Sequence, residues 1–324
     1  MGETDTRVAW LVDIPLVKRV TEKGVVLDSE LYFTRNGDSP HSTLFSSLFQ
    51  RQRGLYTMIA RSDSQQVVGQ FRLKSDHHAH IVYVAPRLEE GADDTLWLHC
   101  LDAMAAEAGR RGAHTLIAEV DENSRLFKTL RTASFAIYAR QEIWQRLPEN
   151  DTLPDAIQPV ELEEARDGDA HEIALLYCNI VPRLIQQIAG LPGNGQGFVY
   201  RKNERVEGYI AVAEGKSGIY MMPHLHPDAF SEATAILAGA MASTRRAKKV
   251  PVYMCVRRYQ DWLEEALTEL GFDICARQAF MVRHIAAGVR YAAFEPLAKK
   301  LEAIPARPPT RSQAERMIET SMWE

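Results

Sequence analysis

The stretch IVYVAPRLEEGADDTLWLHCLDAMAAEAGRRGAHTLIAEVDENSRLFKTLRTASFAIYARQEIWQR, residues 81–146, decides the fold because the chain carries it twice. Adding 137 to each number aligns it without a gap to residues 218–283, and fifteen of the 66 aligned positions are identical. The identical pairs include Tyr83 with Tyr220, Pro86 with Pro223, Leu130 with Leu267, and Gln141 with Gln278. A period of this length is too long for a solenoid. It predicts two copies of one domain-sized unit.

Length and composition describe an ordinary globular protein of two domains. The 324 residues are 46% hydrophobic and 25% charged, with a formal net charge of -5. An acidic chain has no general attraction to nucleic acid or to anionic membranes, so we expect neither as a partner. No apolar run approaches the roughly 20 residues that span a bilayer, and the first residues lack a signal-peptide pattern. We therefore expect a cytoplasmic protein.

The cysteines and histidines give no metal-binding pattern. Four cysteines fall on expected helices and strands without CxxC spacing, which is typical of reduced, buried thiols. The cluster His77-His78-x-His80 falls in an expected hairpin turn, where adjacent histidines are usually solvated. We expect no metal site.

The first unit is predicted to alternate strands and helices from residue 55 onward. Gly24–Leu27 is compatible with a strand. Apolar alternation then predicts a strand pair and a third strand that Pro86 stops, and helical spacing predicts a long helix that Gly112 ends. The expected elements are strands 55–60, 67–73 and 80–85, a helix over 95–111, a strand over 115–120, a helix over 124–133 and a strand over 135–146.

The proline-rich segment 148–159 predicts a linker, which limits the first domain to residues 1–147. The second domain then covers residues 160–286, with a helical stripe over 170–189 that Pro182 splits. A C-terminal tail, residues 287–324, carries a helical pattern that fits either a docked helix or a partner-binding arm, and a homodimer stays open.

The order of these elements resembles the GNAT acyltransferase superfamily. Val84-Ala85-Pro86 before the long helix, Asn123 before the short helix and Ser134-Phe135 at the last strand stand where that family's motifs stand. The resemblance implies an α/β fold of two tandem domains, each a mixed, mostly antiparallel, splayed sheet flanked by helices. In that family acetyl-CoA lies in the V between the fourth and fifth strands.

The resemblance also implies the cofactor-binding residues. The family holds the pyrophosphate of CoA with a glycine-rich loop at the start of the long helix. The aligned loop here is Arg87–Ala92, in which Arg87 and Ala92 fit the pattern, Glu90 replaces a glycine, and a shifted loop that uses Gly91 stays open. Val84 and Asn123 complete the implied acetyl-CoA contacts. The second copy has no glycine in this loop, so we expect no CoA there.

Acyl transfer needs a general base and often a tyrosine acid. The family's tyrosine on the short helix is replaced by Leu130 and Leu267. Glu119 lies on the opposite face of its strand from the residues before and after it, and it is the candidate base. A salt-bridged surface glutamate stays open as the alternative. Tyr83 and Tyr138 are the candidates for lining the acceptor site. The aligned counterpart of Glu119 is Val256, which cannot act as a base.

The sequence thus predicts an acyl-CoA-dependent N-acyltransferase that acts through its first domain on a small-molecule or peptide amine. The missing glycine and tyrosines favour a different class: a catalytically inactive relative that serves as a ligand-binding or scaffold protein. The two differ in whether acetyl-CoA binds.

Overall fold

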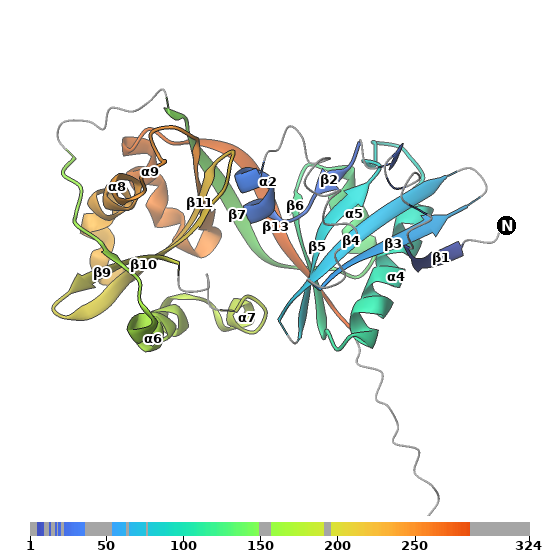
Figure 1. Cartoon of the computed structure of the whole chain (residues 1–324), viewed down its shortest axis with the longest axis horizontal. Helices are drawn as coiled ribbons and strands as arrows, with labels where there is room; N and C mark the ends of the chain where they lie inside the picture. The colour runs from blue at the N-terminus through green and yellow to red at the C-terminus, as the bar shows by residue number, and fades with distance from the viewer. Residues whose placement is uncertain are drawn as a thin grey trace, which may run out of the picture. The chain divides into compact units, whose positions relative to one another are not determined.

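The computed structural model describes residues 5–9, 13, 17, 19–20, 23–35, 54–62, 65–75, 77–148, 157–190 and 196–285 (Figure 1). The predicted tail and most of the predicted linker lie outside these residues, and the domain limits stay predictions. No helix of the described residues is long and apolar enough to cross a membrane.

The first half of the chain contains the elements that its periodicity predicts, the strand expected within Gly24–Leu27, and two elements, at residues 5–8 and 29–35, that the sequence did not predict. In order they are β1 (Asp5–Val8), β2 (Val25–Val26), α2 (Ser29–Arg35), β3 (Leu55–Arg61), β4 (Gln66–Ser75), β5 (His78–Ala85), α4 (Thr95–Arg110), β6 (Thr115–Asp121), α5 (Arg125–Thr132) and β7 (Ala136–Arg146). Asp28 caps α2 by accepting from the Leu31 amide at 3.0 Å. Ser124 caps α5.

The second half repeats the order from β3 onward, with shorter helices in the places of α4 and α5. It contains β8 (Glu163–Glu164), η4 (Asp167–Asp169), α6 (Ala170–Ile180), α7 (Arg183–Gln186), β9 (Gly197–Lys202), β10 (Arg205–Glu214), β11 (Ile219–Leu225), η5 (Pro227–Glu232), α8 (Ala233–Ser243), β12 (Val252–Arg257), η6 (Arg258–Leu263), α9 (Glu264–Glu269) and β13 (Asp273–His284). Pro182 separates α6 from α7, as predicted, because proline cannot donate a helical hydrogen bond.

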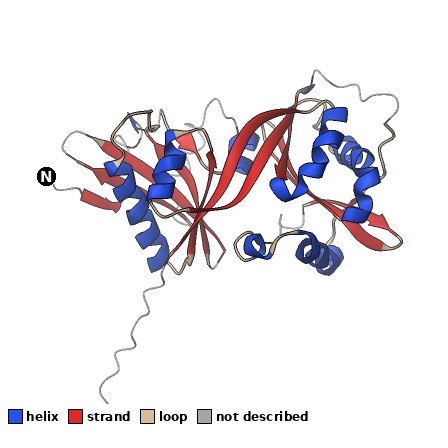
Figure 2. Ribbon diagram, turned by 180° about the vertical axis from the view of Figure 1, so that it is seen from behind, coloured by secondary structure: helices blue, strands red, loops and turns tan. Residues whose placement is uncertain are grey.

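The strands form one 13-stranded sheet across both halves. Its order is β1-β3-β4-β5-β6-β13-β7-β12-β11-β10-β9-β8, with β2 paired to β5 off this path. The last strand of each half is exchanged, because β13 pairs with β6 of the first half and β7 pairs with β12 of the second half (Figure 1). Figure 2 shows the long strands that run through the middle of the described sheet. Neither half therefore completes its own sheet.

The two exchanged strands pair with each other at the centre of the sheet. Gln141 of β7 lies opposite Gln278 of β13, its own counterpart in the repeat. A residue that faces its repeat mate marks a local two-fold axis, which passes between these glutamines at the end of the shared tripeptide Ala-Arg-Gln, residues 139–141 and 276–278.

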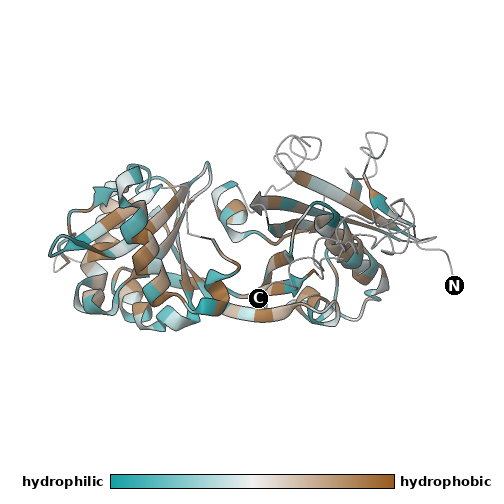
Figure 3. Ribbon diagram, turned by 90° about the horizontal axis from the view of Figure 1, so that it is seen from below, coloured by the Kyte–Doolittle hydropathy of each residue, from teal (hydrophilic) through white to brown (hydrophobic). Residues whose placement is uncertain are grey.

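Each half buries a separate apolar core between the sheet and its helices. Met104 and Leu130 lie in the first core, and Met241 and Leu267 lie in the second; the two leucines have no exposed surface. Long runs of the strands are hydrophobic in Figure 3. The repeated residues of the sequence are therefore mainly core residues, as expected for a shared framework.

Two parallel strand pairs separate after only three residue pairs. β5 and β6 last pair at His80 and Ile117, and β11 and β12 last pair at Met221 and Met254. We call the diverging residues 81–85 and 118–121 the first splay, and residues 222–225 and 255–257 the second splay.

The gapless repeat alignment is wrong at these splays. β5 ends just before Pro86, whereas Pro223 lies inside β11, which ends just before His226-Pro227. A bulge between Gln70 and Phe71 interrupts the β4–β5 register, while β10 and β11 pair without one. His224, one residue before the last of its strand, therefore occupies the place of Tyr83.

The structural counterpart of Glu119 in the second half is likewise not the aligned residue Val256. Val256 packs in the helix-side core with Met254, as Val120 packs in the first core. Cys255 lies on the opposite face with Tyr220, which is the face that Glu119 occupies. Cys255 is therefore the structural counterpart of Glu119.

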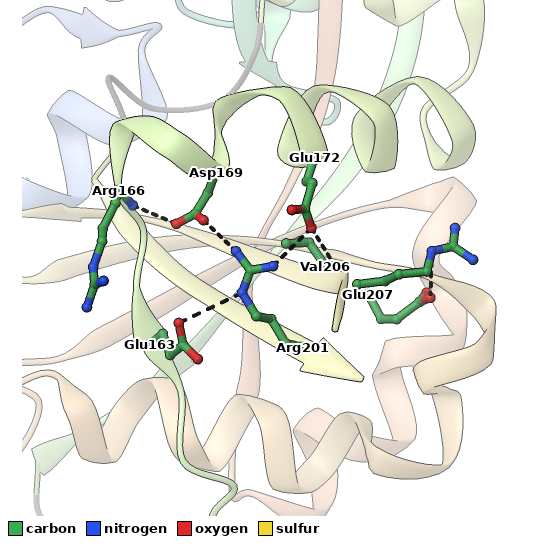
Figure 4. Close-up of polar contacts among 8 residues, drawn as sticks. Glu163, Arg166, Asp169, Glu172, Arg201, Val206 and Glu207 are labelled. Atoms are coloured by element: carbon green, nitrogen blue, oxygen red, sulfur yellow. Dashed lines mark hydrogen bonds and ion pairs between the residues drawn. The ribbon is translucent and has the colours of Figure 1, made fainter. Parts of the chain in front are cut away.

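An ion-pair cluster fixes α6 on the sheet of the second half. The guanidinium of Arg201 on β9 contacts Glu163 at 3.8 Å, Glu172 at 3.0 Å and also Asp169 (Figure 4). Glu172 accepts a further hydrogen bond from the Val206 amide at 3.2 Å. Several acids on one arginine hold a helix in place better than an isolated surface pair.

Candidate functional site

The chain's own segment Lys23–Ser29 fills the first splay. Val25 and Val26 pair with Val84 and Tyr83 of β5. The Leu27 amide donates to the Val82 carbonyl at 2.9 Å, and the Leu27 carbonyl accepts from the Glu119 amide at 3.1 Å. One residue thus bonds both walls, so the segment acts as an added strand between β5 and β6.

Gly24 allows this segment to approach β5 closely. A Cβ at residue 24 would lie 1.7 Å from the Tyr83 hydroxyl oxygen and 1.9 Å from its ring carbon Cζ. Tyr83 is buried, and burial raises the pKa of its hydroxyl despite a hydrogen bond with the Gly24 backbone. Tyr83 therefore packs against this segment rather than facing an acceptor site.

Glu119 lies in the first splay on the face that the sequence predicts, and its carboxylate is engaged. Its Oε2 accepts from the Ser29 amide at 2.8 Å. The Ser29 hydroxyl donates to Gln278 Oε1 at 2.7 Å, and Gln141 Nε2 donates to the same oxygen at 3.0 Å. This network joins the filling segment to the two-fold axis of the sheet.

Tyr138 is not brought together with Glu119 and Tyr83. Its hydroxyl contacts His284 Nε2, and its ring packs beside Ile117, Phe280 and Val282. Tyr138 is the extra residue of a bulge, because Ala139 and Ile137 pair with the successive residues Phe280 and Met281 of β13.

The predicted cofactor loop does not fit CoA with the segment in place. Val84 pairs with Val25, and the Arg87 amide donates to the Lys23 carbonyl at 2.5 Å, so both backbone positions are engaged within the protein. Gly91 has a φ of 78°, with nothing within 4 Å of the point where a Cβ would lie, and Ala92 packs on the first core. Hydrogen bonds and packing within the protein therefore account for the backbone conformation of the Arg87–Ala92 loop.

Acidic groups surround that loop. Asp93 accepts from the Thr95 amide at 3.0 Å, Asp94 contacts Arg125 at 3.3 Å, and Glu90 contacts Lys128 at 3.6 Å. The Asn123 amide donates to Asp121 Oδ1, which makes Asn123 part of a turn. Carboxylates that take up the local cations leave little positive potential for a pyrophosphate.

The second splay carries His224, which the sequence places where a ligand would enter the second domain, and Arg257, which no sequence motif singles out. His224 of β11 is 1% exposed, and neither ring nitrogen has a hydrogen-bond partner among the described residues. Its ring lies 5.5 Å from that of Tyr177 and stacks on Tyr209 at 6.4 Å between centroids. Burial, with the nearby charge of Arg257, lowers the pKa of His224 to about 3.

Arg257 of β12 is a buried cation on the other wall. It is 4% exposed, its Nε has no hydrogen-bond partner among the described groups, and it interacts with the hydroxyls of Tyr177 and Tyr259. Within the described part of the chain, no carboxylate lies at ion-pair distance from its guanidinium. A signal existed in the sequence: His224 and Arg257 interrupt strands that are otherwise apolar.

A pocket of about 390 Å³ reaches Arg257 from the central strands. Its lining includes Gln141, Gln278, Arg258 and two ion pairs, Arg140 with Glu122 at 2.6 Å and Arg277 with Glu142 at 2.9 Å. The pocket therefore joins the two-fold axis to the second splay.

One further group brings an imidazole and carboxylates together. His226 Nδ1 lies 3.1 Å from Glu207 and 3.4 Å from Asp228, and Glu207 is buried. Lys202 and Arg205 lie near these acids, so ion pairing within the protein accounts for the arrangement.

His224 is expected to make the protein acid-sensitive. The folded state keeps this imidazole neutral down to about pH 3, while the unfolded chain takes up a proton below about pH 6.5. Stability is therefore lost as the pH falls from 6.5 toward 3, by up to about 1.4 kcal/mol per pH unit. Urea unfolding across this range should show a shallower acid limb in His224→Phe, and no change in slope for the exposed His99→Gln. Equal slopes in wild type and His224→Phe contradict the assignment.

Two splays in one continuous sheet, each with a long helix after its first strand, define the class: the chain has the tandem GNAT acyltransferase fold, and that prediction is confirmed. It is similar to a GCN5-related N-acetyltransferase from Sphaerobacter thermophilus, with a TM-score of 0.54 and 11% identity over 87% of this chain and 96% of that one.

A second similar structure is a tandem GNAT protein from the clavulanic acid biosynthesis pathway. Its TM-score is 0.52, with 14% identity over 87% of this chain and 99% of that chain. No protein-family model matches the sequence. No curated protein matches it either. Identities this low establish the fold alone.

Proposed function

We propose that this protein is a GNAT-fold binding protein whose first splay does not use acetyl-CoA. The observation that carries the proposal is the pairing of Val25 and Val26 with β5, together with the bond of Leu27 to both walls. A ligand that lies in the V needs the same edge of β5. Each backbone N–H or C=O group at that edge forms its hydrogen bond with one neighbour, either the segment or the ligand.

The chemistry of the surrounding residues supports the proposal. Glu90 stands where the family has a glycine, and Leu130 stands where it has the tyrosine acid. The carboxylate of Glu119 serves as an acceptor for Ser29, which gives it a structural role. On this proposal the protein keeps the fold of an acyltransferase, while the polar groups of its first splay stabilise its own structure.

Thermal unfolding of the whole chain with CoA and with acetyl-CoA tests this proposal. A ligand at about 100 times its Kd stabilises a folded protein by about 2.7 kcal/mol. We expect no saturable rise in Tm with either compound. A saturable rise, or acetyl-CoA turnover with any amine, overturns the proposal.

A second candidate is an N-acyltransferase whose first splay opens when segment Lys23–Ser29 leaves. The observation that favours it is the position of Glu119, whose Oε2 is bonded only to the segment among its described hydrogen bonds. Departure of the segment frees this carboxylate to act as a general base toward an amine. Turnover that is abolished by Glu119→Gln supports this candidate over the first.

A further inference from the structure

We propose that the second splay binds a small organic carboxylate, held by Arg257 and His224. This site lies apart from the first splay and does not depend on whether that splay uses acetyl-CoA. It rests on buried polar groups, on the charge of Arg257 and its immediate neighbours, and on a pocket that borders Arg257.

The first observation is a concentration of buried polar atoms without protein partners. Among the described residues these are both ring nitrogens of His224, Nε of Arg257 and Oε1 of Gln260. All three side chains are at least 96% buried. A buried donor or acceptor without a partner costs about 1–3 kcal/mol, so several in one place indicate a site that completes its hydrogen bonds with a bound group.

These groups face one another across the second splay. Tyr177 contacts the His224 ring and interacts through its hydroxyl with Arg257. Gln260 donates through Nε2 to the Pro223 carbonyl at 2.8 Å, which ties it to the strand that carries His224. In the first splay the corresponding carbonyl, that of Val82, is bonded by the backbone of Leu27. The second splay is thus lined by side chains instead of an added strand.

The charge of the cluster selects an anion. Arg257 brings one positive charge, and the neighbouring Tyr177, Tyr259 and Cys255 are all neutral, because burial raises the pKa of each above its usual value. Glu119 acts on Arg257 only as a more distant charge, since no ion pair joins them in the described structure. A buried cation needs an opposite charge nearby.

A carboxylate fits these donors better than a phosphate. One guanidinium matches the single charge and the planar fork of a carboxylate, whereas a phosphate dianion needs further cations. Neutral His224 offers one N–H donor to the second carboxylate oxygen. Gln260 Oε1 is an acceptor and selects a hydroxyl or amine next to the carboxylate. A pocket of about 390 Å³ borders Arg257 from the side of the central strands, and Asp261 and Glu264 also line it.

Thermal unfolding of the full chain with acetate and with glycolate tests the proposal, with chloride and inorganic phosphate at matched ionic strength as comparisons. We expect a saturable rise in Tm with the carboxylates, larger for glycolate, and none with chloride or phosphate. Arg257→Met should weaken carboxylate binding by about tenfold or more, the effect of removing one charged hydrogen bond. Arg245→Met, which removes the same charge from an exposed arginine outside the pocket, should bind as the wild type does.

A second measurement covers the case in which Arg257→Met does not fold. The ring ¹⁵N signals of wild-type His224 can be assigned by their loss in His224→Gln. These signals should shift on addition of glycolate, and the midpoint concentration should equal that of the thermal titration. Unchanged His224 signals, an equal response to chloride, or unaltered affinity in Arg257→Met overturns the proposal and leaves ordered water as the partner of these groups.

Discussion

Replacement of Gly24 by valine is expected to drive segment Lys23–Ser29 out of the first splay. Any side chain at residue 24 overlaps Tyr83, whose hydroxyl oxygen lies 1.7 Å from the Cβ position. The ring cannot move aside, because it is 2% exposed and packs against Leu55, Val82 and Ala85. Overpacking a site of this kind costs about 1–3 kcal/mol, and leaving the splay relieves it.

Hydrogen–deuterium exchange measures this departure directly. The Leu27 and Glu119 amides are bonded across the segment in the wild type, so peptides covering residues 23–29 and 115–121 should exchange faster in Gly24→Val. Gly168→Val is the matched control, since nothing lies within 4 Å of a Cβ at that glycine. Wild-type exchange rates in Gly24→Val would show that the close contact does not hold the segment.

The same variant separates the two candidate functions. If the first splay has lost acetyl-CoA use, Gly24→Val still gives no saturable thermal shift, because the acids around Arg87–Ala92 remain. If the segment is a gate, the variant binds acetyl-CoA where the wild type does not. Loss of turnover in the double variant with Glu119→Gln would then assign the base.

The framework of this fold could be predicted from the sequence, and the filling of its splays could not. Core periodicity is local, so Met104, Leu130 and their repeat mates indicated the helices and strands correctly. β2 is only two residues long, and its partners on β5 and β6 lie some 60 and 90 residues away. A two-residue strand with distant partners carries no periodic signal.

Strand exchange was hidden by the repeat itself. β7 and β13 share the same tripeptide, so the sequence of each fits the edge of either half. The placement of Tyr83 opposite Tyr220 failed for a related reason, because a bulge shifts the register of β5 and leaves no trace in a gapless alignment. Identical residues in the two copies therefore mark the shared core, but at the splays they do not mark structurally equivalent positions.

Leu130→Ala and Leu267→Ala are each expected to lower the free energy of unfolding of the whole chain by about 2–5 kcal/mol. Both side chains are fully buried, one in each core, and truncation leaves a cavity. Because β13 completes the first sheet and β7 completes the second, neither half keeps its central strand when the other unfolds.

A single cooperative transition follows from this exchange of strands. Trp97 packs in the first core and Trp262 packs against the second, so single-tryptophan variants report each half separately by fluorescence. In Leu130→Ala the two reporters should move to lower urea together, and in Leu267→Ala likewise. Two domains that fold independently would instead show a shift in the mutated half alone. That outcome would mean that the pairing of the central strands contributes less free energy to coupling the halves than either core contributes to the stability of its own half.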